Sequence, residues 1–136
     1  MSHLKDSAFQ FTNPVIVSMK YELNPKYHRN SDTIYTRSIR RNISRSKNSN
    51  DALLMVTLNI GGEDSTNPWV NVSLTMAANF HWDDSLNEKA DDLLKLNGTS
   101  LLLGYMRPVI SNITAYSPGG SLNIPFMNLV DEVKDD

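Results

Sequence analysis

The chain has 136 residues, of which 40% are hydrophobic, and its 13 Lys and Arg against 15 Asp and Glu give a formal net charge of −2. This length suits one domain that buries enough apolar surface to fold without a covalent staple, and the absence of cysteine excludes disulfides and thiolate metal sites. No apolar run approaches the ~20 residues of a membrane span, and the first ten residues lack a signal peptide's apolar core, so we expect a soluble, cytoplasmic protein.

Charge is distributed unevenly along the chain. Residues 1–50 hold nine Lys and Arg against three Asp and Glu, a net +6, whereas residues 51–136 hold four against twelve, a net −8. Such an asymmetry marks either a surface for a charged partner or two solvated faces that attract their opposites in an oligomer. The second interpretation is the simpler one.

The first 83 residues alternate between apolar and polar with the period of a half-buried strand. Residues 9–23 read FQFTNPVIVSMKYEL, and Pro14 cannot donate to a ladder, so this strand is expected at a sheet edge or with a bulge. Three more strands are predicted at 34–47, 52–60 and 69–82, and the last has the cleanest alternation. Because sequential strands with short connections usually pair with one another, we expect an antiparallel meander.

The period then changes to that of helices. Ser85 to Glu88 has the form of a capping box, so a short helix is predicted to run to about residue 96, with Asn97-Gly98 as its stop. A longer helix is predicted at 100–117. The expected fold class is α+β, a single domain with a four-stranded antiparallel sheet (7–83), a short and a long helix packed on it (84–118), and a tail that is part extended and part helical (119–136).

The long predicted helix has more apolar surface than one sheet can cover. On a helical wheel its apolar arc spans about 200°, whereas a helix lying on a sheet needs little more than ~100°. Pro108 and Gly104, four residues before it, both lie on the polar arc, where water reaches the carbonyl that the proline leaves unbonded. The surplus apolar surface predicts contact with the tail or with a second subunit, and the expected interface residues are Leu101, Leu102, Tyr105, Met106, Val109 and Ile113.

The block LLLGYMRPVISNITAYSPGGSLNIPFMNL, residues 101–129, resembles the SecB family of export chaperones. The resemblance is carried by Leu101 to Leu103, Tyr105, Arg107, Ile110, Ile113 and the Leu122-Asn123-Ile124-Pro125 segment, and the strand at 69–82 also looks like the family's last strand. It implies a four-stranded sheet backed by a long helix and a homo-oligomer, a dimer of dimers with the helices between sheets. It also implies an ATP-independent holdase chaperone that binds unfolded polypeptides and serves protein transport, or, as in relatives at toxin–antitoxin loci, protects one antitoxin.

Two features depart from the family pattern. The chain ends at VDEVKDD where family members continue into a second helix, and the second strand is basic where the family presents an acidic surface to the secretion motor. Fold and holdase behaviour are therefore carried over as expectations, and docking to the motor is not.

A holdase needs exposed apolar side chains. Methionine and aromatic residues suit promiscuous recognition because they are flexible or offer large apolar faces, whereas Met76 and Phe80 share the inward parity of their strand and are expected in the core. The residues predicted to bind clients are Trp69, Trp82, Phe126, Met127 and Leu129.

Two further classes of function are weighed against this one. A basic ribbon on the second strand offers an RNA-binding module as an alternative, although pairing of its arginines with acidic residues of a neighbour is the favoured explanation. The ribbon comprises Tyr35, Arg37, Arg40, Arg41, Arg45 and Lys47. Enzyme function has little support, because no phosphate-binding or nucleophile motif is present. Residues 81–84, HWDD, read better as an acidic helix start than as a metal site, so neither metal nor cofactor is expected.

Overall fold

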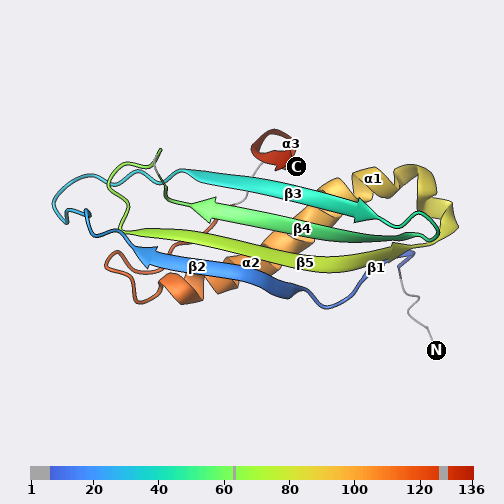
Figure 1. Cartoon of the computed structure of the whole chain (residues 1–136), viewed down its shortest axis with the longest axis horizontal. Coiled ribbons are helices and arrows are strands. Elements are labelled where there is room, and N and C mark those ends of the chain that lie inside the picture. The colour runs from blue at the N-terminus through green and yellow to red at the C-terminus, as the bar shows by residue number, and fades with distance from the viewer. Residues whose placement is uncertain (1–6, 63, 126–128) are drawn as a thin grey trace, which may run out of the picture.

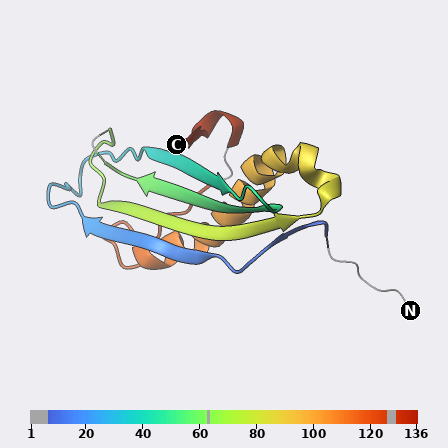
Figure 2. The same ribbon diagram turned by 45° about the vertical axis from the view of Figure 1, so that its right-hand side comes forward.

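The computed structural model describes residues 7–62, 64–125 and 129–136. A mixed, mostly antiparallel sheet carries the helices on one face, and no helix covers the opposite face in either view (Figure 1, Figure 2). The strands are β1 Phe9–Phe11, β2 Val15–Leu23, β3 Arg37–Arg45, β4 Asp51–Ile60, β5 Val70–Trp82 and β6 Val133–Asp135. The helical segments are η1 Asp84–Lys89, α1 Ala90–Asp92, η2 Leu93–Gly98, α2 Thr99–Thr114 and α3 Leu129–Glu132.

The strand order corrects the predicted meander. β3, β4 and β5 follow one another as expected, but β2 pairs with β5 instead of β3, and the connection 24–36 crosses from one edge of the sheet to the other. This is a Greek-key type of order. It places the long apolar strand β5 between two partners, where a meander would have left it as an exposed edge that invites aggregation.

The predicted first strand is interrupted before Val15, at Pro14, which has no backbone N–H to donate. β1 and β2 both pair with β5, from Phe9 opposite Trp82 and from Val15 opposite Ala77. Residues 12–14 separate the two strands, because proline has no N–H for the ladder. A single predicted strand is therefore two short ones on the same edge.

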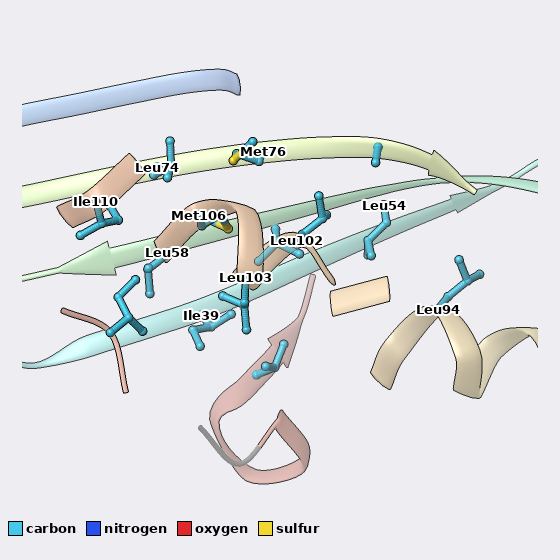
Figure 3. Close-up of a cluster of buried hydrophobic side chains, with 14 of the residues drawn as sticks. Ile39, Leu54, Leu58, Leu74, Met76, Leu94, Leu102, Leu103, Met106 and Ile110 are labelled. Atoms are coloured by element: carbon cyan, nitrogen blue, oxygen red, sulfur yellow. The ribbon is translucent and has the colours of Figure 1, made fainter. Parts of the chain in front are cut away.

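The core lies between the sheet and α2, and the alternation predicted for β4 and β5 is confirmed. Figure 3 shows Leu54, Leu58, Leu74 and Met76 of the strands lying against the helix. Each fully buried side chain of this kind stabilises the fold by about 1.5–3 kcal/mol. The α2 residues that face the sheet, each at most 2% exposed, are Leu102, Leu103, Met106 and Ile110.

The helical region runs from Asp84 to Thr114 without the break predicted at Asn97-Gly98. Gly98 is buried, and a Cβ there would lie 2.9 Å from the Leu54 Cδ2 and 3.3 Å from the Phe80 ring. The glycine is therefore needed for close packing on the sheet and does not cap a helix. The predicted capping box is also misplaced: Ser85 and Glu88 both lie inside η1, and the N-cap residue is Asp83, which makes no side-chain capping bond.

After α2 the chain turns back along the helix as far as residue 125, and residues 129–136 lie beside β3. The Thr114 hydroxyl donates to the Ile110 carbonyl at 2.7 Å and accepts the Leu122 N–H at 2.8 Å, which fixes the returning segment to the helix end. Residues 129–136 then form α3 and β6, and β6 adds to β3 in parallel. Within the predicted tail, residues 119–125 carry no helix or strand, and residues 129–135 are divided between α3 and β6. None of the described helices is both long and apolar enough to span a membrane.

Candidate functional site

A groove of about 770 Å³ runs along the face of α2 that points away from the sheet. Its walls are mostly apolar and include Leu129 from the returning chain. We call it the helix groove, and its lining residues are Leu96, Asn97, Ser100, Leu101, Gly104, Tyr105, Pro108 and Leu129.

The helix sequence explains why this face is hollow. Gly104 has no side chain, and a Cβ built there meets no atom within 4 Å. Pro108, one turn later, contributes only its compact ring, so the two positions leave a depression between larger neighbours. Leu96 and Tyr105 beside it are both 43% exposed. The helix groove is thus an open, shaped apolar surface of the kind that binds extended chains or other proteins.

A second apolar surface lies on β2. This strand lies at the sheet edge, and β5 is its only partner among the described strands. α2 packs mainly on β4 and β5, and apolar side chains on the side of β2 that faces the helix layer stay exposed. Ile16 and Met19 are each 49% exposed. We call this surface the β2 flank, and its residues are Ile16, Met19 and Leu23, which lie opposite the core-facing Met76, Leu74 and Val70 of β5.

The predicted client-binding residues do not form one site. Trp82 is fully buried, with its indole N–H donating to the Asn87 Oδ1 at 2.9 Å and the Arg45 guanidinium over its ring. The prediction for Trp82 is therefore corrected: it is a core residue. The available signal was its parity, which Trp82 shares with Met76 and Phe80, the two residues of this strand that were expected in the core.

Trp69 is half-buried at the opposite end of the sheet from the start of the helices. Its ring lies edge-on to Tyr35 at 4.7 Å and to Tyr27 at 6.2 Å, and Gly119 packs directly on the indole. Burial raises the pKa of Tyr35. Its hydroxyl oxygen accepts a hydrogen bond from the backbone N–H of Trp69 at 2.8 Å. Trp69 thus holds loops together, away from the helix groove.

Leu129 is the predicted client-binding residue that the structure brings to the helix groove. Phe126 and Met127 fall outside the described residues. Sequence reasoning missed the depression itself, because Gly104 and Pro108 were assigned to a polar arc. The available signal was two residues without long side chains, one turn apart, between apolar neighbours.

The six predicted interface residues divide by helix face. Leu102 and Met106 are buried against their own sheet, so the prediction for these two is corrected. Leu101 and Tyr105 line the helix groove. Val109 and Ile113 are half-buried and follow Tyr105 at four-residue spacing, so they share its flank of the helix.

The basic strand β3 is matched by acidic residues of the same chain. The ion pairs are Arg37–Glu132 at 2.9 Å, Arg40–Asp136 at 2.7 Å, Arg41–Asp135 at 2.5 Å and Arg45–Asp91 at 2.9 Å. Four of the nine basic residues of the first half are thus paired with carboxylates of the second half of the same chain, where carboxylates of a neighbour were expected. A ribbon so neutralised is poorly suited to bind nucleic acid.

The carboxylates at the metal-like cluster do not converge. His81 and Trp82 lie on opposite faces of β5, and the His81 Nδ1 contacts the Asp51 carboxylate at 2.9 Å. Hydrogen bonds from Ser49 and His81 lower the pKa of Asp51. Within the described residues, no three His, Asp or Glu side chains come together as metal ligands.

Comparison with known proteins supports the fold. No family model and no curated protein matches the sequence. The Mycobacterium tuberculosis Rv1957 SecB-like chaperone, solved in complex with a ChAD peptide from the Rv1956 HigA1 antitoxin, superposes with a TM-score of 0.71 at 12% identity, covering 88% of this chain and 91% of its own. A Streptococcus agalactiae protein of unknown function superposes with a TM-score of 0.45 at 10% identity, over 87% and 97% of the two chains. The first match establishes a SecB-like fold, and the second is too distant to bear on it.

Proposed function

We propose that this chain, with its SecB-like fold, is an ATP-independent chaperone that binds extended, unfolded polypeptides in the helix groove. The observation that carries the proposal is the groove itself, an open, mostly apolar depression on a face of α2 that the described residues leave unfilled. The bound antitoxin peptide of the structurally similar chaperone supports a polypeptide as the ligand. Phosphate-binding motifs are not needed for this role, which depends on equilibrium binding alone.

The proposal includes self-association through the β2 flank. An exposed apolar edge strand of nine residues is a liability in a monomer, because its free N–H and C=O groups and its side chains both invite pairing. A second copy that covers the flank would remove that liability, and Val109 and Ile113 lie on the adjoining side of the helix. A dimer, or the dimer of dimers that the family resemblance implies, is the proposed assembly. The proposal does not extend to docking on a secretion motor, since β3 is basic.

Suppression of aggregation tests the proposed function. A reduced, unfolded model protein would be diluted from denaturant with and without the purified chain, in the absence of ATP, and turbidity would be followed. We expect suppression that rises with the molar ratio of chain to client and is unchanged by added ATP. Aggregation at the control rate over all ratios would contradict a holdase.

A dedicated chaperone for one partner is the second candidate. The observation that favours it is the antitoxin peptide bound to the structurally similar chaperone. Crosslinking and mass spectrometry of the protein purified from its native host separate the two: a holdase yields many unfolded clients, whereas a dedicated chaperone yields one protein in stoichiometric amount.

A further inference from the structure

The outer edge of β3 is occupied by the chain's own acidic segment, residues 129–136. From here on, the name tail refers to these residues alone and no longer to the whole of 119–136. β6 pairs with β3 through three residues, Ile39 opposite Val133, Arg40 opposite Lys134 and Arg41 opposite Asp135, and the Asp136 N–H adds a bond of 2.9 Å to the Arg41 carbonyl. Figure 1 shows the tail (red) alongside β3, remote in sequence from it. The contact is a short strand held at a sheet edge.

Side chains make this edge selective for acidic residues. Arg41 is only 7% exposed, and its guanidinium donates to both Asp135 oxygens, at 2.5 and 3.2 Å, and to the Lys95 carbonyl at 2.7 Å. A buried guanidinium without a counterion is strongly unfavourable. If the tail leaves, the guanidinium keeps the Lys95 carbonyl but loses its counterion, so a segment that brings a carboxylate to the place of Asp135 is favoured over one that does not.

The fit of the tail is incomplete. β6 covers three positions of a strand that has nine, so a longer extended chain would form more backbone bonds. Lys134 lies opposite Arg40, and like charges directly opposite one another destabilise a strand pair. Val133, 7% exposed, is the apolar anchor of the tail and joins the core cluster beside Ile39. In Figure 3 the red end of the chain lies next to Ile39 and Leu103.

We propose that the β3 edge is a second polypeptide-binding site, which takes extended acidic segments by strand addition, and that the tail is an internal ligand that such segments displace. The ligand has an apolar residue at the place of Val133 and carboxylates at the places of Glu132, Asp135 and Asp136. The physiological role of this site, binding a client, rests on the proposed chaperone function. Binding of an acidic peptide to the β3 edge does not depend on that function. A tethered ligand competes at high effective concentration, so clients without matching carboxylates stay excluded.

Peptide binding tests the proposal directly. The probe is a fluorescein-labelled peptide with the sequence of the tail, LVDEVKDD, and its matched control is LVNQVKNN, in which amides replace the carboxylates. Binding is measured by fluorescence anisotropy to the wild-type chain and to the isosteric variant Glu132→Gln/Asp135→Asn/Asp136→Asn. We expect the variant to bind the acidic peptide at least tenfold more tightly than wild type does, and neither protein to gain affinity for the neutral peptide. Equal affinity of both proteins for the acidic peptide would overturn the proposal.

If that variant does not fold, a reversible disulfide between β3 and β6, which we call the lock, tests the same proposal. Because the chain has no cysteine, Arg40→Cys/Lys134→Cys places one disulfide across the β3–β6 register. The oxidised form is expected to bind the acidic peptide at least tenfold more weakly than the same protein after reduction. Equal binding in the two redox states would show that the edge is not the site, and an increase in mass by light scattering on reduction, without peptide binding, would assign the edge to a second copy instead.

These outcomes are separable from those of the proposed function. If the locked form suppresses aggregation as well as wild type while peptide binding does not respond to the lock, the holdase stands and the second site does not. If peptide binding follows the lock but no protein suppresses aggregation, the edge binds acidic segments and the holdase assignment fails.

Discussion

Two glycines in one helical run have opposite roles, and the difference is decided by what surrounds each Cα. Gly98 faces Leu54 and Phe80 in the core, whereas Gly104 faces the open helix groove. Alanine is favoured over glycine in a helix by about 1 kcal/mol, but forcing a methyl group into a filled core costs about 1–3 kcal/mol. The same substitution is therefore expected to have opposite signs at the two positions.

We predict that Gly98→Ala lowers the free energy of unfolding by up to about 2 kcal/mol, the overpacking cost less the helix gain, while Gly104→Ala raises it by about 0.5–1 kcal/mol. Urea denaturation followed by circular dichroism measures both. A stabilised Gly98→Ala protein would show that the helix does not pack on the sheet as closely as described.

The Arg41–Asp135 pair makes attachment of the tail depend on pH. The hydrogen bond from Arg41 lowers the pKa of Asp135 below its ordinary 3.8. A lowered folded-state pKa contributes stability that is fully present above the unfolded pKa and is lost as the pH falls through the folded value. Asp135→Asn should thus be less stable than wild type at pH 7, and the difference should shrink as the pH drops below about 4. Denaturant unfolding at several pH values measures it, and a difference that does not change with pH would contradict the ion pair.

At the scale of elements, sequence periodicity predicts the strands well and their neighbours poorly. The alternation of β4 and β5 determines which side chains face the core, and Pro14 marks the interruption between β1 and β2. The order of the strands in the sheet cannot be predicted from periodicity, because it depends on which strand is apolar enough to need a partner on both sides. The placement of β2 beside β5 follows from that comparison and not from any local pattern.

The candidate site is predictable only in part. An excess of apolar surface on the long helix is visible on a wheel, and Tyr105 and Leu129 both lie in the helix groove. The same wheel cannot say which apolar residues the chain's own sheet covers, so it did not separate Leu102 from Leu101. The match between β3 and the tail is also hidden, because nothing local links residues about 95 positions apart in sequence.

The β2 flank gives a prediction at the element scale. Ile16→Lys/Met19→Lys places two charges on the uncovered side of β2, where desolvation on contact with a second copy is costly. We expect a lower mass by size exclusion with light scattering and an unchanged circular dichroism spectrum. Ser18→Lys, which adds a charge to the other face of the same strand, is the matched control and should keep the wild-type mass. A wild-type chain that is already a monomer at micromolar concentration would contradict the proposed assembly.

Across the whole molecule, charged and apolar side chains are concentrated on different surfaces: charges at β3, and exposed apolar side chains at the β2 flank and the helix groove. The basic first half and the acidic second half meet at β3, where they neutralise each other within the chain. The apolar surplus remains at two places, the β2 flank and the helix groove, and neither is filled by the described residues. Self-association accounts for the first and client binding for the second.

The central claim is that clients occupy the helix groove, and filling the groove tests it most directly. Gly104→Leu adds a side chain where the structure has open space and also favours the helix, so the protein should fold at least as stably as wild type; Gly104→Ala favours the helix with little added bulk and is the control. Affinity for a reduced, carboxymethylated, fluorescently labelled model protein is measured by anisotropy for all three. The account predicts that Gly104→Ala binds like wild type and that Gly104→Leu binds at least tenfold more weakly. Wild-type affinity in a folded Gly104→Leu protein would contradict it.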